Sequence, residues 1–362
     1  MRAPVRWFVV GVLCGAPAAA GAQQAQRLYV TNQDDATITV VDLPSHRVLE
    51  TIDLQQLGYP ANAKPHHAQV EPDGSHWYAT LIGAGKVLKF DRDNRVVDSA
   101  AMEVPGLLAL HPTRDLLVVA RSMSAVNPPR RIALIRRSNM EVLDEVDIFF
   151  PRPHAIATVG DWAYVASLGV NQLAAVRLDG GEVRLVDVDG PYHTLTQFAL
   201  SPDRRWLVVT GSTSARVLVY DLVDPGTPTL AHEVALEPGP FESAFTADGR
   251  QLVVSNLDAN AVSFVNTTTW TVAQVVRHEA FRQPHGVALG PDGRYVYVSN
   301  RFQSGGAHDH EGHKATGSGN VVAICVPTRQ VDDVVPAGHY AAGIGVAAPG
   351  VPQGAELPAA CR

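Results

Sequence analysis

Short stretches in which apolar and polar residues alternate recur along the whole chain, and turn sequences separate them. Alternation with a period of two is typical of β-strands. No stretch keeps the 3.6-residue apolar period of a helix, so the sequence predicts an all-β protein with almost no helix. The turns at 71–74 (EPDG) and 290–293 (GPDG) suit this reading, because proline presets φ and glycine accepts positive φ.

One strand pattern occurs seven times. The copies are RLYVTN (27–32), HWYATL (76–81), LLVVAR (116–121), WAYVAS (162–167), WLVVTG (206–211), QLVVSN (251–256) and YVYVSN (295–300). Successive copies lie 40 to 49 residues apart. A period in the forties with short strands is the signature of β-propeller blades, so we expect seven of them.

Each repeat carries four strands in the same order. An inner strand precedes the repeated strand, and third and fourth strands follow it, as in TITVVD (37–42), VLETID (48–53) and EVDIFF (145–150). The first repeat lacks an inner strand, whereas YAAGIGVAAPG (340–350) resembles an inner strand with nothing after it. We expect this C-terminal strand to pair into the N-terminal blade, since ring closure removes exposed sheet edges.

The first 22 residues read as a secretory signal peptide. Arg2 and Arg6 give a basic start, the apolar run at 7–13 is too short to span a bilayer, and 20–22 form a small-residue cleavage pattern. No later segment reaches 18 apolar residues. The sequence thus predicts a periplasmic or secreted monomer without a membrane span, with a seven-bladed propeller at 23–350 and a C-terminal tail at 351–362.

The net charge and the cysteines indicate which binding partners and which cellular compartment to expect. The formal net charge is −7, and loss of Arg2 and Arg6 makes the remainder more acidic, which argues against nucleic-acid binding. Cys325 and Cys361 remain after the signal peptide is removed. An oxidising compartment permits a disulfide between them; a buried thiol plus a free tail thiol is the alternative.

The motif YVTN at 29–32, followed by TITVVDL (37–43) and VLETIDL (48–54), resembles the YVTN-repeat seven-bladed β-propellers. The segment PHGVALGPDGRYVYVSN (284–300) repeats the match. The resemblance covers essentially the whole chain after residue 22 and implies the fold. It implies no single chemistry, because such propellers include surface proteins, binding proteins and oxidoreductase domains.

Histidines gather where inner strands begin. His66, His154 and His285 each follow a proline at one position of the repeat, and the other blades carry Gly106, Thr196, Phe241 and Gly343 there. His67 adjoins His66, while His193 and His339 lie a few residues before their inner strands. Because strand direction alternates within a blade, all of these are expected at one mouth of the central tunnel.

A histidine-rich loop, GGAHDHEGHKATGSGN (305–320), is expected on the same face. Neutral imidazole is the commonest ligand of copper and zinc and also ligates haem. The sequence therefore predicts a metal or haem site drawn from His66, His67, His154, His193, His285, His339, His308, His310 and His313. Of these, His285, His339 and His66 form the better single-metal set. The alternative is that the histidines pack the tunnel and the loop is only polar.

Three further residues on this face are candidates. Arg301 can bind a carboxylate or phosphate of a cofactor, with Asn300 beside it; the alternatives are solvated charge and a turn cap. Glu242 is a weaker candidate for a general base. The chain has no Gly-x-Ser-x-Gly, no phosphate-binding glycine loop and no Cys-x-x-Cys-His, so serine hydrolysis, nucleotide binding and c-type haem lack support.

These features predict an exported propeller that binds copper, zinc or haem at the tunnel mouth, with a redox-related role. The architecture is similar to the haem-bearing propeller domain of nitrite reductases and the copper-bearing propeller of nitrous oxide reductase. This chain lacks their attached electron-transfer domains, which leaves two alternatives. One is a non-catalytic propeller that binds a small molecule or periplasmic protein. The other is a metal-dependent lyase or lactonase.

Overall fold

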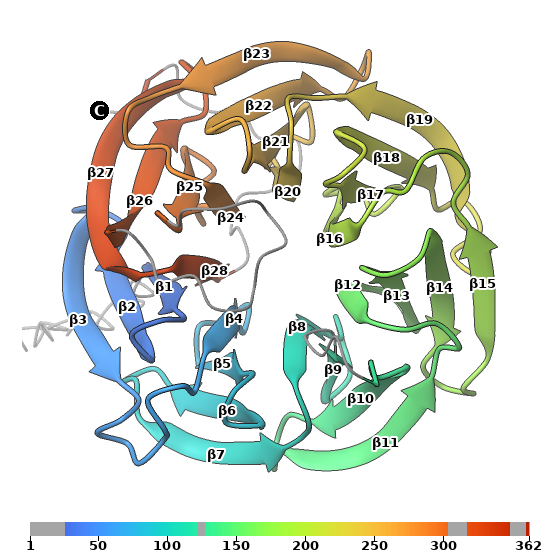
Figure 1. Ribbon diagram of the computed structural model, residues 1–362, viewed down its shortest axis with the longest axis horizontal. Helices are drawn as coiled ribbons and strands as arrows, with labels where there is room; N and C mark the ends of the chain where they lie inside the picture. Colours follow the sequence, from blue (N-terminus) through green and yellow to red (C-terminus); the bar gives the residue numbers. More distant parts are fainter. Residues whose placement is uncertain (1–25, 122–126, 303–316, 348–359, 362) are drawn as a thin grey trace, which may run out of the picture.

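The computed structural model describes residues 26–121, 127–302, 317–347 and 360–361. In these ranges the chain forms seven antiparallel sheets of four strands each. The sheets stand around a common centre like the blades of a propeller (Figure 1). The predicted all-β, seven-bladed fold is confirmed. The same ranges contain no helix that could cross a membrane.

The strands are described blade by blade, from the innermost outward. The innermost strands of blades one to seven are β28 (Ala341–Val346), β4 (Pro65–Val70), β8 (Pro105–Leu110), β12 (Pro153–Val159), β16 (Leu195–Leu200), β20 (Pro240–Phe245) and β24 (Pro284–Leu289). The second strands are β1 (Arg27–Asn32), β5 (His76–Leu81), β9 (Leu116–Arg121), β13 (Trp162–Ser167), β17 (Trp206–Gly211), β21 (Gln251–Asn256) and β25 (Tyr295–Asn300). The third strands are β2 (Thr37–Asp42), β6 (Lys86–Asp91), β10 (Arg131–Arg136), β14 (Gln172–Arg177), β18 (Arg216–Asp221), β22 (Ala261–Asn266) and β26 (Ser318–Cys325). The outermost strands are β3 (Arg47–Asp53), β7 (Val96–Ala101), β11 (Glu141–Asp147), β15 (Val183–Asp187), β19 (Thr229–Ala235), β23 (Thr271–Arg277) and β27 (Gln330–His339).

The seven repeated segments of the sequence are the seven second strands, with the predicted bounds. One outer strand differs from prediction. We expected a strand over 145–150, but β11 ends at Asp147, because the backbone turns at Phe149 with a φ of 64°. The Asp147 carboxylate accepts a hydrogen bond from the Phe149 amide (2.8 Å), which stabilises that turn.

The ring closes as predicted. Strand β28 pairs antiparallel with β1, with Val30 opposite Ile344, so the two ends of the chain share blade one (Figure 1). Two glycines allow β28 to approach the inner strand of blade two. A Cβ atom on Gly343 would lie 2.1 Å from the carbonyl oxygen of His66, and one on Gly345 would lie 2.8 Å from the backbone of Ala68.

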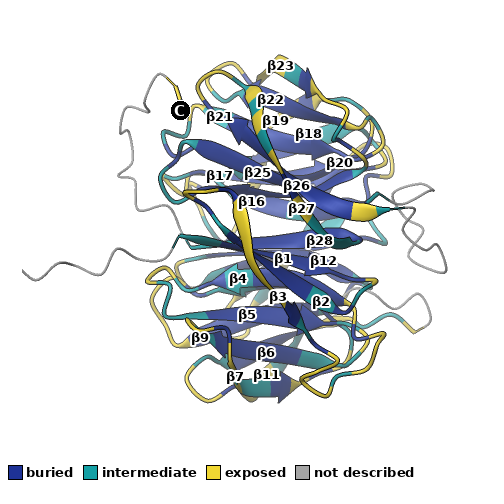
Figure 2. Cartoon of the chain, turned by 90° about the vertical axis from the view of Figure 1, so that its left-hand side faces the viewer, coloured by how far each residue is buried: buried dark blue, intermediate teal, exposed yellow. Residues whose placement is uncertain are grey.

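The apolar core is divided among the seams between neighbouring blades, with one main cluster at each seam. Tyr29 of blade one stacks on Trp77 of blade two with ring centroids 4.2 Å apart. Exposed residues lie in the loops at the two edges of the ring and along outermost strands such as β3 and β19 (Figure 2). Because each cluster needs both blades, no blade has a core of its own.

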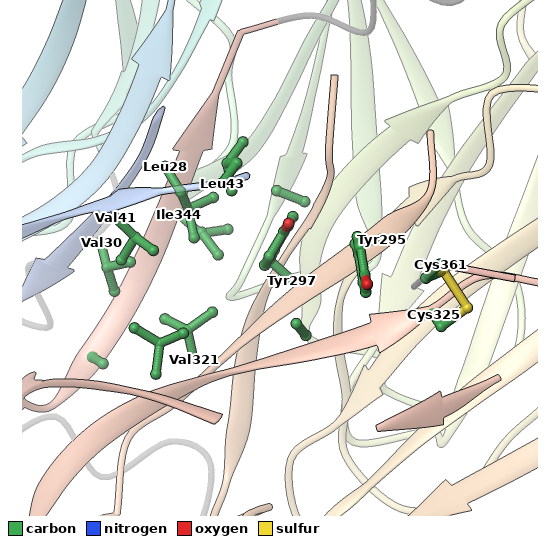
Figure 3. Packing of buried hydrophobic residues seen from close by; sticks show 14 residues of the cluster. Leu28, Val30, Val41, Leu43, Tyr295, Tyr297, Val321, Cys325, Ile344 and Cys361 are labelled. Atoms are coloured by element: carbon green, nitrogen blue, oxygen red, sulfur yellow. A yellow bond between two sulfur atoms is a disulfide. The ribbon is translucent and has the colours of Figure 1, made fainter. Parts of the chain in front are cut away.

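A disulfide joins Cys325, at the end of β26, to Cys361. It lies in the cluster at the seam between blades seven and one, where Tyr295 and Ile344 also pack (Figure 3). The Arg294 guanidinium donates a hydrogen bond to the carbonyl of Cys361. The disulfide that the sequence left open is therefore present, and it fixes the segment beyond β28 to blade seven.

We expect Cys361→Ala to lower the free energy of unfolding by about 3 to 4 kcal/mol, because the disulfide closes a loop with a sequence separation of 36 residues. Urea unfolding of the oxidised protein and the variant measures the difference. Reductant should lower the stability of the unsubstituted protein to a similar extent and leave the variant unchanged. Equal stability with and without reductant would contradict a stabilising bridge.

Candidate functional site at the start of the inner strands

Every inner strand begins with a register shift against the second strand of its blade. In blade two the shift falls between Pro65 and His67, and in blade four between Pro153 and Ala155. Such a bulge releases a residue from the ladder and re-aims its side chain. We call the first released residue of each blade, together, the inner ring: His66, Gly106, His154, Thr196, Phe241, His285 and Ala342.

In blade one the ring position falls on Ala342 and not, as the sequence alignment had it, on Gly343. Ala341 pairs with Asn32 as Pro284 pairs with Asn300 in blade seven. The sequence comparison of the repeats was one residue off at blade one because no turn such as EPDG (71–74) or GPDG (290–293) follows β28 to fix the register.

Hydroxyl groups tie the carbonyls of the inner ring to the preceding blade. The donors occupy the fifth position of the second strand: Thr31 bonds His66 O (3.2 Å), Thr210 bonds Phe241 O (2.6 Å), Ser255 bonds His285 O (2.7 Å) and Ser299 bonds Ala342 O (2.5 Å). In blade four this position is Ala166, which has no hydroxyl. There the imidazole of His154 donates to the carbonyl of Thr196 instead (2.5 Å).

This bond fixes the tautomer of His154. A carbonyl only accepts, so Nδ1 carries the proton and the lone pair of the neutral ring lies on Nε2. Burial lowers the pKa of His154 to about 4, so the imidazole is neutral at physiological pH. No described residue forms a hydrogen bond with Nε2. An Nδ1–H held by a backbone carbonyl is the usual support for a histidine that ligates metal through Nε2.

His66 and His67 of blade two lie near His154 of blade four. The rings of His66 and His154 have centroids 5.7 Å apart. The blade between them contributes Gly106 to the ring, and the missing side chain leaves room for this contact. Burial, and secondarily the charge of His154, lower the pKa of His67 to about 4. The amide side chain of Gln33 donates to Nδ1 of His66 (2.8 Å).

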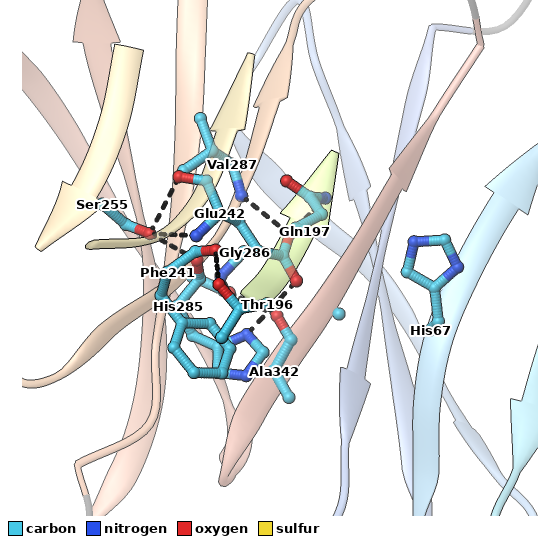
Figure 4. A network of polar contacts seen from close by, with 12 residues as sticks. His67, Thr196, Gln197, Phe241, Glu242, Ser255, His285, Gly286, Val287 and Ala342 are labelled. Carbon is cyan, nitrogen blue, oxygen red and sulfur yellow. Dashed lines mark hydrogen bonds and ion pairs between the residues drawn. The ribbon is translucent and has the colours of Figure 1, made fainter. Parts of the chain in front are cut away.

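Glu242 and His285 form a second buried group (Figure 4). Oε2 of Glu242 accepts hydrogen bonds from Gln197 Nε2 (3.1 Å) and the amide of Val287 (3.3 Å), while Oε1 lies 3.5 Å from Nδ1 of His285. Burial raises the pKa of Glu242 to about 8, so the carboxyl group is mostly protonated at neutral pH. Since Oε2 already accepts two bonds, Oε1 is the oxygen left to carry the proton, facing His285.

Arg301 and Asn300 differ in what surrounds them. The Arg301 guanidinium donates to the Tyr340 hydroxyl (2.6 Å) and lies against the rings of Tyr340 and Phe241. Asn300 is used within the fold: its amide nitrogen donates to Val298 O (3.1 Å) and Asn320 Oδ1 (2.8 Å), and its oxygen accepts from the Arg282 amide (3.2 Å). The bonds to Val298 and Arg282 join the side chain of Asn300 to backbone groups, as expected of a residue that caps a turn.

The other candidate histidines lie in separate networks. His193 bonds Ser214 Oγ (2.8 Å) through Nδ1 and Asp189 O (2.9 Å) through Nε2. His339 bonds Asp35 (2.8 Å), where β27 leads into β28. The ring of His66 thus meets that of His154, and the grouping of His66 with His285 and His339 stays a prediction. His308, His310 and His313 lie outside the described residues.

Within the described ranges no group of three or more His, Cys, Asp or Glu side chains is placed to hold a metal ion. A zinc site built by protein alone needs three or four such ligands. A haem iron takes its equatorial nitrogens from the macrocycle and needs only one or two ligands from the protein.

Sequence reasoning missed Gln33, Gln197 and Tyr340, which bond the candidate residues. A signal for Gln33 was present. It follows YVTN in the first repeat as Arg301 follows YVSN in the seventh, so both occupy the position directly after the second strand. Gln197 and Tyr340 carry no such signal, because their partners come from other repeats.

Glu242 makes the stability of the fold depend on pH. Its pKa is about 8 in the folded state, against an ordinary 4.5, so the folded protein binds this proton more tightly than the unfolded chain. The contribution is fully present below pH 4.5 and is lost as the pH rises through 8. We expect this group to lower the free energy of unfolding by roughly 1 to 2 kcal/mol between pH 6.5 and 8.

The isosteric variant Glu242→Gln removes the titration. Urea unfolding of both proteins across this pH range should give a difference that changes with pH, since groups remote from Glu242 contribute equally to the two curves. Parallel curves would show that Glu242 is already ionised at neutral pH in the folded protein.

No family model matches the chain, so the resemblance to YVTN-repeat propellers stays a prediction. The antigen Lp49 of Leptospira interrogans serogroup Icterohaemorrhagiae serovar copenhageni is 23% identical over 304 residues, which cover 76% of this chain and 62% of the antigen. The chain thus spans less than two thirds of that relative's length.

Two solved structures share the fold. Dihydro-haem d1 dehydrogenase NirN in complex with DHE has a TM-score of 0.58 at 15% identity, covering 92% of this chain and 78% of NirN. The hydrazine synthase of Kuenenia stuttgartiensis has a TM-score of 0.60 at 19% identity, covering 76% of this chain and 87% of the matched chain. At these identities the likeness establishes for this chain a β-propeller fold and nothing finer.

Proposed function

We propose that the protein is an exported propeller that binds a haem-type tetrapyrrole at the inner ring, with His154 as the protein ligand to its iron. The observation that carries this proposal is the hydrogen bond from Nδ1–H of His154 to the carbonyl of Thr196. It leaves Nε2 with a lone pair, and the low pKa keeps that atom unprotonated at physiological pH. When bound, the iron would supply redox or ligand-binding chemistry.

The position of His154 explains why this residue and not another would serve. Its ring donates a hydrogen bond to the carbonyl of Thr196 in blade five and lies beside the ring of His66 in blade two. His154 thus contacts residues of two other blades. His193 lies shortly before its inner strand, and both of its ring nitrogens are already bonded, to Ser214 and to Asp189. Binding through His193 would cost one of those bonds.

The neighbouring groups suit proton transfer beside such a cofactor. Glu242 is a buried acid that holds its proton at neutral pH and faces the imidazole of His285. A carboxyl with a pKa near the working pH can both give and take a proton. The imidazole of His67, whose pKa burial lowers to about 4, would stay uncharged at neutral pH. This arrangement favours chemistry in which protons accompany electrons.

The comparisons favour a tetrapyrrole over a bare copper or zinc ion. NirN, which matches 92% of this chain, is a dihydro-haem d1 dehydrogenase solved in complex with DHE. The described histidines offer pairs, not the three-ligand group that a protein-only zinc or copper site needs.

The proposal is tested by titrating haem into the protein and following the Soret band. We expect His154→Ala to weaken haem binding at least tenfold and to change the ligand-field bands, because one iron ligand is lost. Binding of metal-free protoporphyrin IX should be unaffected by the same substitution, since it has no iron to ligate. In His154→Gly, added imidazole should restore the spectrum of the unsubstituted protein.

His232→Ala is the matched control, because His232 is exposed on the outer strand β19 and contacts Trp206 and Trp270. It should bind haem as the unsubstituted protein does. Equal haem affinity and identical spectra for His154→Ala would remove the assignment of His154. Absence of any haem binding by the unsubstituted protein would remove the proposed function itself.

A further inference from the structure

Arg301 is the most completely buried arginine among the described residues, with 1% of its surface exposed. No carboxylate of the described chain lies within 4 Å of its guanidinium. Other arginines on the propeller have such a partner: Arg121 pairs with Glu145, and Arg137 with Glu71 at 2.8 Å. A buried charge without a counter-ion destabilises the folded protein, and Arg301 is such a charge among the described residues.

Neutral groups satisfy only part of the guanidinium. Nη1 donates to the Tyr340 hydroxyl (2.6 Å), and Nη2 lies 3.5 Å from the side-chain oxygen of Gln283. Nε has no hydrogen-bond partner, although it is buried. Since a guanidinium has five N–H donors, the edge formed by Nε and Nη2 retains capacity for two parallel hydrogen bonds. Two parallel N–H groups match the two oxygens of one carboxylate.

Two aromatic rings lie against the guanidinium of Arg301. The guanidinium carbon lies 4.8 Å from the centre of the Tyr340 ring and 5.8 Å from that of Phe241. Both rings therefore contribute cation–π contacts to the buried guanidinium, but neither supplies a negative charge. Phe241 belongs to the inner ring and packs on His285 with centroids 4.3 Å apart. Arg301 therefore lies beside the inner ring.

The nearest acidic residue of that site does not serve as the counter-ion. The oxygens of Glu242 contact Gln197, Val287 and His285, and no ion pair joins Glu242 to Arg301. The positive charge is thus left for a group that comes from outside the described chain.

We propose that Arg301 is a carboxylate-binding site beside the inner ring, in which the Nε–Nη2 edge binds the two oxygens of one carboxylate. The carboxylate belongs either to a side chain of a bound tetrapyrrole or to a free small acid. The site does not depend on the proposed iron ligand, because it recognises charge and shape and not a metal.

The experiment uses metal-free probes and the full chain. Protoporphyrin IX and its dimethyl ester differ only in their carboxylates, so their affinities, measured by fluorescence titration, isolate the contribution of the acid groups. Acetate, measured by calorimetry, represents the free small acid. We expect the unsubstituted protein either to bind protoporphyrin IX at least tenfold more tightly than the ester, or to bind acetate while it binds the two porphyrins alike.

Arg301→Gln should abolish whichever preference is found and leave ester binding unchanged. Arg301→Lys, which keeps the charge but loses the planar fork, should retain only part of it. Arg121→Gln is the matched control and should behave as the unsubstituted protein, because Arg121 already holds Glu145. Thermal unfolding of each variant establishes that it is folded.

Two results would overturn the proposal. One is a preference for carboxylates that survives in folded Arg301→Gln. The other, which needs no variant, is an unsubstituted protein that neither binds acetate nor distinguishes the acid from the ester. The outcome is separable from that for His154, since His154→Ala should change haem binding and leave the difference between acid and ester intact.

Discussion

The pairing of β28 with β1 is the interaction on which the rest of the propeller depends. Every blade packs its apolar residues against two neighbours, so the core is complete only when the first and last blades meet. Closure also sets the spacing of the inner strands, since Gly343 and Gly345 let β28 approach β4. The residues of the inner ring then face one another at fixed distances, although they come from blades far apart in the sequence.

The inner ring is fixed at a finer level by the hydroxyl groups that cross the seams. Four blades use a serine or threonine to hold the carbonyl of the next inner strand, as Ser255 holds His285. Blade four has Ala166 instead, and there the carbonyl of Thr196 is bonded by the ring of His154. The imidazole that takes the place of a hydroxyl is thereby held as the tautomer with its proton on Nδ1.

The sequence predicted the fold closely because the repeated strand carries its own alternating pattern and a period. It also placed His66, His154 and His285 at one level, since that required only counting along the repeat. It did not predict that His66 meets His154, which depends on the absent side chain of Gly106 in the blade between them. Nor did it predict the burial of Glu242 and Arg301, because their surroundings come from residues distant in sequence.

The disulfide between Cys325 and Cys361 gives the ring a second closure, of a different kind from the first. Strand β28 is held to β1 by hydrogen bonds, which can be peeled apart one at a time from a free end. The bridge removes that free end by anchoring the chain beyond β28 to β26. A mechanical load applied at Cys361 would therefore enter the protein through blade seven and bypass the pairing of β28 with β1.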